Sequence, residues 1–213
     1  MKYEAVIFDL DGVICFTDKY HYKAWKAVAD KLGIYFDEKI NDRLRGVSRM
    51  ESFEIILEKY EGEMSQEEKE KWITEKNTIY KELLKDMSEK DLSSEVKETL
   101  DGLRAKGLVL AIGSSSKNAR FILGQLGLGD FFDAISDGNN IEKSKPDPEV
   151  FIKAAQFVNK DAEKCLVVED AKAGVQAAKS GNMDCAFVGE NKEDGTQADY
   201  CLGSFSQLLD VVE

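Results

Sequence analysis

Acidic side chains gather directly after two apolar runs of the sequence. Asp9 and Asp11 follow a run near the amino terminus. Glu169 and Asp170 follow a second run far along the chain. Each pair alone is also typical of a turn or of the acidic start of a helix. Together, clustered carboxylates repel one another and favour a bound cation, and oxygen ligands suit Mg²⁺, so the sequence indicates Mg²⁺ as a cofactor.

Two other kinds of metal site fit the sequence less well. Counted from Asp9, the glycine and the closing glutamate of an EF-hand loop would fall on Ile14 and Tyr20, which excludes that calcium site. Zinc sites use histidine or cysteine ligands. The chain has a single histidine, His21, and its four cysteines form no C-x-x-C pair.

Hydroxyl and ammonium groups follow two further runs. The serines at 114–116 are typical either of a helix N-cap or of an anion site at a strand-to-helix turn. Lys145 suits either a structural ion pair or a phosphate clamp. A carboxylate nucleophile, a metal, a hydroxyl and a lysine around one anion are the groups that phosphoryl transfer through an aspartyl-phosphate requires. A carboxylate two residues further on suits a general acid and base. Neither a P-loop nor G-x-G-x-x-G occurs.

Strand and helix patterns alternate along most of the chain. Apolar runs predict strands at 3–8, 108–112, 134–136, 165–168, 185–188 and 200–202, and periodic stripes predict helices at 95–106, 118–126, 149–158, 173–180 and 206–212. This alternation predicts an α/β fold with a parallel sheet. Ligands of such sheets bind beyond the carboxyl ends of the strands, where the polar groups above are expected to meet.

A helical insertion interrupts this alternation between the first two strands. A stripe that includes Trp25 ends at Gly33, and Ser48 with Glu51 forms a capping box for a second helix. A third helix carries Lys76 on its apolar stripe, where a lysine either snorkels to solvent or points into a site. The two chain crossings beside the insertion would act as a hinge.

Composition limits the partners of the chain. It has 213 residues with 41 acidic and 29 basic side chains, which gives a net charge of −12. Nucleic acid and anionic membranes are therefore unfavourable partners. No uncharged run exceeds 10 residues, too few to cross a membrane. We also expect no signal peptide, reduced and mostly buried cysteines, a cytoplasmic location and a monomer.

The chain resembles the haloacid dehalogenase superfamily of phosphotransferases over essentially its whole length. The similarity is carried by Phe8-Asp9-Leu10-Asp11-Gly12-Val13, Gly113-Ser114, Lys145-Pro146-Asp147 and Val168-Glu169-Asp170. It implies a Rossmann-like parallel sheet core, 1–16 with 88–213, and an inserted all-helical cap domain, 17–87. It also implies that Asp9 is the nucleophile and a metal ligand, and that Asp11 is the general acid and base with its carbonyl on the metal. Glu169 and Asp170 would complete the Mg²⁺ site.

Within the superfamily, the chain is most similar to the phosphomutases that act on β-glucose phosphates. The residues behind this second similarity are Thr17, His21, Trp25, Gly46, Val47, Ser48, Arg49, Lys76, Asn77, Ser116, Lys117 and Asn118. The resemblance implies that Ser114 and Lys145 hold the transferring phosphate. The non-transferring phosphate would be bound by Arg49, Ser116, Lys117 and Asn118. His21 and Lys76 would position Asp11 and the sugar hydroxyls.

The implied reaction interconverts β-D-glucose 1-phosphate and β-D-glucose 6-phosphate through β-glucose 1,6-bisphosphate. Such an enzyme needs two phosphate sites, because the intermediate must turn round before it returns a phosphoryl group. A sugar-phosphate phosphatase of the same superfamily is the alternative, since it shares the core residues and delivers the phosphoryl group to water. Arg49 with Lys117 and Asn118 favours the mutase. A non-catalytic sensor would be expected to lack Asp9 or Asp11, and both are present.

Overall fold

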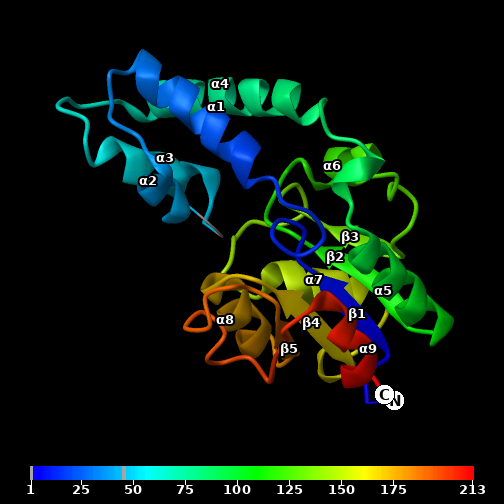
Figure 1. The fold of residues 1–213 in the computed structure, drawn as a ribbon. Coiled ribbons are helices and arrows are strands. Elements are labelled where there is room, and N and C mark those ends of the chain that lie inside the picture. Colours follow the sequence, from blue (N-terminus) through cyan, green and yellow to red (C-terminus); the bar gives the residue numbers. More distant parts are fainter. Residues whose placement is uncertain (1, 45–46) are drawn as a thin grey trace. The chain divides into compact units, whose positions relative to one another are not determined.

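The computed structural model describes residues 2–44 and 47–213. The chain divides into two compact units, which Figure 1 shows in sequence colours. One unit contains Met1–Phe16 and Ser88–Glu213, and the other contains Thr17–Met87. Each unit has a hydrophobic core of its own.

A parallel sheet forms the centre of the first unit. Its described strands lie in the order β3-β2-β1-β4-β5-β6. They are β1 (Ala5–Phe8), β2 (Val109–Gly113), β3 (Ala134–Ser136), β4 (Cys165–Glu169), β5 (Asp184–Phe187) and β6 (Tyr200–Cys201). β1 pairs with β2 on one side and β4 on the other, and all its residues are buried. A strand covered on both faces has no solvent side, which explains its unbroken apolar sequence.

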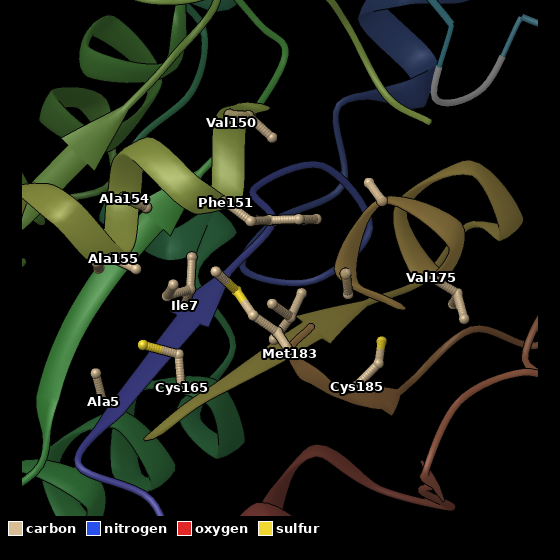
Figure 2. Close-up of a cluster of buried hydrophobic side chains, with 14 of the residues drawn as sticks. Ala5, Ile7, Val150, Phe151, Ala154, Ala155, Cys165, Val175, Met183 and Cys185 are labelled. Carbon is tan, nitrogen blue, oxygen red and sulfur yellow. The ribbon is translucent and has the colours of Figure 1, made fainter. Parts of the chain in front are cut away.

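Helices cover both faces of this sheet. Those of the first unit are α5 (Ser94–Ala105), α6 (Ala119–Gln125), α7 (Glu149–Phe157), α8 (Lys172–Ser180) and α9 (Leu208–Val211), with 3₁₀ turns η1 (Glu89–Asp91), η2 (Ala162–Lys164) and η3 (Phe205–Gln207). Figure 2 shows Ile7 of β1 in a cluster with Phe151 of α7 and Val175 of α8. Phe8 points the opposite way, because side chains alternate along a strand. Its ring contacts Phe132 and Phe205, beside α5 and α9.

Helices are the only regular secondary structure among the described residues of the second unit. Its helices are α1 (Asp18–Lys31), α2 (Glu38–Asp42), α3 (Arg49–Leu57) and α4 (Gln66–Leu84). Capping boxes begin α3 and α4: the expected one pairs Ser48 with Glu51, and a second pairs Ser65 with Glu68. Trp25 of α1 stacks on Phe53 of α3 with ring centroids 5.8 Å apart. These rings lie in the core of the unit.

The predicted α/β fold with a Rossmann-like parallel sheet is confirmed. Each predicted strand is present, with its ends shifted by at most two residues. The predicted C-terminal helix is wrong in one respect, because it divides into η3 and α9. Helix α2 was not predicted; it is a single turn in which the Ile40 amide donates to the Asp37 carboxylate at 2.9 Å. Its five residues are too few to show a periodic stripe.

The cysteines and the helices agree with two simpler expectations. Cys15, Cys165 and Cys185 are buried free thiols, and Cys201 is an exposed one. A search of the described helices finds none with the length and apolar character that a membrane crossing requires.

Candidate active site

Three carboxylates lie together where β1 and β4 end. The sheet places β1 beside β4, with Phe8 opposite Val168, so Asp9 and Glu169 follow neighbouring positions. The Asp9 amide donates to the Val168 carbonyl at 2.9 Å. Oxygens of Asp9, Glu169 and Asp170 lie within 4.8 Å of one another. Strands β2 and β3 extend this parallel sheet on one side of β1, whereas β4, β5 and β6 extend it on the other (Figure 1). The strand order therefore switches between β1 and β4, which is where such sheets form ligand sites.

Lys145 links two of these carboxylates. Its ammonium donates to Asp9 Oδ1 and to Glu169 Oε1, both at 2.6 Å, and its side chain is 3% exposed. It also lies 4.6 Å from the centre of the Phe151 ring. The sequence left a structural ion pair and a phosphate clamp open for this lysine. The ion pair is present, and it holds the ammonium beside Asp9.

Both oxygens of Glu169 already have protein donors. Oε1 accepts from Lys145, and Oε2 accepts from the amides of Asp170 at 2.8 Å and Ala171 at 2.9 Å. A Cβ on Gly174 would lie 1.8 Å from Oε1, so this glycine leaves room for the carboxylate. Glu169 therefore orders the end of β4 as well as contributing charge.

A second glycine, Gly12, leaves room for the Asp170 carboxylate. A Cβ on Gly12 would lie 2.0 Å from Asp170 Oδ2, and the φ of Gly12 is +86°. Only glycine adopts that angle at low cost, so Gly12 serves both the turn after Asp11 and the approach of Asp170. Gly12 and Gly174 were not predicted as site residues. For Gly12 the signal was its place in the Asp-x-Asp-Gly turn, whereas nothing in the sequence links Gly174 to Glu169.

The carboxylates carry more negative charge than Lys145 balances. Burial raises the pKa of Asp9 to about 7, opposed by Lys145 and reinforced by Glu169 and Asp11. Burial, Glu169 and Asp9 raise the pKa of Asp170 to about 9. Burial alone would lower the pKa of Lys145, yet Asp9 and Glu169 raise it overall. A buried, oxygen-only set with unbalanced negative charge fits a divalent cation such as Mg²⁺.

A serine-rich segment follows β2 beside this cluster. The Ser114 amide donates to the Ser136 carbonyl at 3.0 Å, and its buried hydroxyl accepts from the Ser116 amide at 3.2 Å. The Ser116 hydroxyl accepts from the Asn118 amide at 3.2 Å. Asn118, which is buried, is the N-cap of α6. The serine hydroxyls therefore accept hydrogen bonds within the segment. The alternative prediction, in which a serine is the N-cap of this helix, does not hold. Lys117 is exposed and forms no ion pair with a described residue.

The second unit gathers aromatic rings around Lys76. Its ammonium lies 2.8 Å from His21 Nδ1, 4.5 Å from the centre of the Tyr80 ring and 4.9 Å from that of Trp25. His21 stacks on Tyr80 at 4.2 Å. Lys76 is 2% exposed, so it does not snorkel to solvent. Tyr80 lies one helical turn after Lys76 on the same stripe, but it was not predicted as a site residue.

Positive charge surrounds His21. Burial, Lys76 and Arg49 together hold the pKa of His21 well below its usual range. Arg49 is the first residue of α3, and burial lowers the pKa of its guanidinium. Arg49 forms no ion pair with any residue in the described part of the chain. A half-buried cation without a carboxylate partner is a suitable contact for an anionic ligand.

The remaining predicted residues of this unit lie at element ends. Thr17 is buried, and its carbonyl accepts from the amides of Tyr20 and His21 at the start of α1. Val47 lies half-buried in the bend before α3. Gly46 was also predicted, but it lies outside the described residues.

The predicted residues thus form two groups. The sheet unit contains Asp9, Asp11, Ser114, Ser116, Lys117, Asn118, Lys145, Glu169 and Asp170, and the helical unit contains Thr17, His21, Trp25, Val47, Arg49 and Lys76. The first group combines carboxylates, hydroxyls and two lysines, which are the groups for phosphoryl transfer. The second combines two cations with aromatic rings, which suits a phosphorylated polar ligand.

Comparison with known proteins defines the class. The sequence profile of the haloacid dehalogenase-like hydrolases matches residues 6–188. The chain therefore belongs to the haloacid dehalogenase-like hydrolase family, an enzyme family of phosphotransferases and hydrolases.

Within that family the chain resembles β-phosphoglucomutase. It is 39% identical to the β-phosphoglucomutase of Bacillus subtilis over 191 residues, which cover 89% of this chain and 84% of that protein. A crystal structure of β-phosphoglucomutase from Clostridium difficile matches with a TM-score of 0.90 and 40% identity, covering 97% of this chain and 93% of that one. The chain is also 34% identical to a phosphorylated carbohydrates phosphatase of Thermotoga maritima over 184 residues, covering 85% of this chain and 82% of that protein.

Proposed function

We propose that this protein is a β-phosphoglucomutase, which interconverts β-D-glucose 1-phosphate and β-D-glucose 6-phosphate through an aspartyl-phosphate and β-glucose 1,6-bisphosphate. The similarity to the Bacillus subtilis and Clostridium difficile enzymes supports this activity. A mutase must bind a phosphate that is not being transferred as well as one that is. Binding of the phosphate that is not being transferred distinguishes a mutase from a simple phosphatase.

The observation that carries the proposal is the guanidinium of Arg49, which forms no ion pair with a described residue. A half-buried cation costs free energy when no anion accompanies it, and no described carboxylate forms an ion pair with Arg49. The non-transferring phosphate of a sugar phosphate would supply that anion. Lys117 is a second cation without a described acidic partner, and the proposal assigns it, with Ser116 and Asn118, to the same phosphate.

Asp9 and Asp11 divide the chemistry between them. An oxygen of the Asp9 carboxylate attacks phosphorus, and the bond between phosphorus and the sugar oxygen breaks. Asp11, as the carboxylic acid, donates its proton to that sugar oxygen. In the reverse direction the Asp11 carboxylate takes the proton from a sugar hydroxyl as this hydroxyl attacks the phosphoryl group on Asp9. Because the sugar accepts the phosphoryl group at either end, the two sugar phosphates interconvert.

The surrounding groups hold the phosphoryl group and its charge. The Ser114 hydroxyl and the Lys145 ammonium would bind the transferring phosphate beside Asp9. Asp9, Asp11, Glu169 and Asp170 would hold Mg²⁺, which supplies positive charge against the repulsion between phosphate and carboxylates when it is bound.

The helical unit would recognise the sugar. His21 stacks on Tyr80, and Lys76 packs against Tyr80 and Trp25, so these contacts would orient their polar atoms for hydroxyl groups. In the proposal His21 and Lys76 position Asp11 and the sugar hydroxyls. The other predicted contacts with substrate are Thr17, Trp25, Gly46 and Val47. We further propose a cytoplasmic monomer, in keeping with the four free cysteines.

A product assay tests this function. The enzyme receives β-glucose 1-phosphate, Mg²⁺ and a trace of β-glucose 1,6-bisphosphate, and glucose 6-phosphate and inorganic phosphate are both counted. We expect glucose 6-phosphate to accumulate without a matching amount of inorganic phosphate, and Asp9→Asn to form neither. Stoichiometric inorganic phosphate would instead support the sugar-phosphate phosphatase, which the similarity to the Thermotoga maritima protein keeps as the second candidate.

A further inference from the structure

The loop after β3 holds the serine-rich segment through its main chain. We call Asp137–Asn140 the β3 loop and Ser114–Asn118 the phosphate segment. The Gly138 amide donates to the Ser116 carbonyl at 3.2 Å. The Asn139 side-chain amide donates to the Lys117 carbonyl at 3.0 Å. Two successive carbonyls of the phosphate segment are therefore fixed by two successive residues of the β3 loop.

Gly138 also contacts the phosphate segment closely. A Cβ on this buried glycine would lie 2.4 Å from the Ser115 carbonyl oxygen and 3.0 Å from the Lys117 amide nitrogen. It would lie 2.9 Å from Cγ of Lys117. The first two atoms belong to the main chain, so the segment itself would have to move. The first part of the Lys117 side chain therefore packs directly against Gly138.

A buried carboxylate keeps the β3 loop in shape. Asp137 is 1% exposed, and its Oδ1 accepts from the amide of Asn139 at 2.9 Å and from its side chain at 3.1 Å. The Asp137 amide donates to Asn140 Oδ1 at 3.0 Å. The side-chain amide of Asn139 thus bridges Asp137 and the Lys117 carbonyl, and this fixes its direction.

We propose that Gly138 and Asn139 are positioning residues for phosphate recognition. They fix the main chain of Ser116 and Lys117, so that the Lys117 ammonium is available to bind the non-transferring phosphate. This ammonium has no ion-pair partner among the described residues. The inference rests on the proposed function for the identity of this anion. Gly138 and Asn139 contact the phosphate segment in the same way whether the enzyme transfers the phosphoryl group to sugar or to water.

Two variants with matched controls test this role. Gly138→Ala adds the Cβ that has no room, whereas Gly124→Ala adds one on α6 where nothing lies within 4 Å. Asn139→Ala removes the bond to Lys117, whereas Asn191→Ala removes a comparable turn bond to Asp194 at 3.1 Å, away from the segment. KM is measured for the sugar monophosphate that the wild type consumes, whichever product forms. Phosphorylation of Asp9 by acetyl phosphate is measured in parallel, because this small donor has no second phosphate.

We expect KM to rise about three- to tenfold in Asn139→Ala, the range for one lost hydrogen bond, and by more in Gly138→Ala. Phosphorylation by acetyl phosphate should stay within about twofold of the wild type, and both controls should match it in both assays. An unchanged KM in Asn139→Ala, or equal losses in both assays, would overturn the positioning role. If the wild type releases inorganic phosphate and no isomer, the mutase proposal fails, while the comparison of KM values still decides this inference.

Discussion

The charge on individual residues distinguishes the two groups of site side chains. Asp9 and Asp170 have raised pKa values because burial and neighbouring carboxylates disfavour their ionised forms. Arg49 and His21 have lowered pKa values because burial disfavours their charged forms. The first group therefore favours a cation, and the second favours an anion. The proposed substrate, a sugar phosphate bound together with Mg²⁺, would supply both.

Removing Arg49 should separate the two phosphate roles. For Arg49→Ala we expect isomerisation of β-glucose 1-phosphate to fall about 10²- to 10³-fold, the scale for one lost charged contact in an active site. Phosphorylation of Asp9 by acetyl phosphate should change by only a few-fold, because this donor carries a single phosphate. Steady-state kinetics with each donor measure the split. Arg43→Ala is the control, since Arg43 is an exposed arginine of the same unit paired with Glu58 at 2.6 Å. Equal losses with both donors would contradict the role of Arg49.

His21 should make the stability of the helical unit depend on pH. Its pKa is lowered in the folded chain, so below about pH 6.5 the unfolded chain binds a proton that the folded chain does not. Stability should therefore be full above pH 6.5 and fall as the pH decreases, by up to about 1.4 kcal/mol per pH unit. Urea unfolding at pH 7.5 and 5.5 measures this change. In His21→Gln the decrease should be smaller, and an identical decrease in both proteins would exclude His21 as its source.

At the scale of elements, burial and capping explain which parts of the fold the sequence predicts. Strand β1 and the capping boxes of α3 and α4 were predictable because each rests on neighbouring residues in the chain. The short α2 was not, because one turn has no period. The contact of Gly174 with Glu169 was not predictable either, because the two residues lie in different elements. It depends on how closely α8 packs against β4.

The candidate site was predictable to a similar extent. Strand order brings Asp9, Glu169 and Asp170 together, and the rule that ligands bind at strand ends anticipates this. The sequence left two alternatives for Lys76, and its burial against Tyr80 excludes snorkelling. Whether Arg49 has an acidic partner depends on the packed structure, so no sequence pattern could predict it.

The two capping boxes offer a matched pair of variants. Ser48→Ala and Ser65→Ala each remove a side chain that accepts from the amide three residues on, and each should cost about 1 kcal/mol of stability. Ser48 is followed by Arg49, so its loss should also lower isomerase activity, about three- to tenfold. Ser65 is distant along α4 from Lys76, so its loss should leave activity within about twofold. Urea unfolding measures the loss of stability, and the product assay measures the loss of activity. Equal activity in both variants would show that the cap of α3 has no role in catalysis.

At the scale of the whole molecule, the net charge of −12 is an average that does not describe the site. Much of the acidic surplus lies on exposed positions such as those from 61 to 71, where side chains are solvated. In the proposal, Lys145 and Lys117 of the sheet unit and Arg49 and Lys76 of the helical unit are the cations that bind the substrate. An acidic protein can therefore bind an anionic sugar, while its surface stays unfavourable for nucleic acid.

A pulse and chase of the phosphoryl group tests the central claim most directly. The enzyme is phosphorylated with ³²P-labelled acetyl phosphate, freed of the donor and then mixed with unlabelled β-glucose 1-phosphate and Mg²⁺. We predict label on the peptide that contains Asp9, none in Asp9→Asn, and transfer of that label to glucose 1,6-bisphosphate when the sugar is added. Release of the label as inorganic phosphate, at the same rate with and without sugar, would contradict the account.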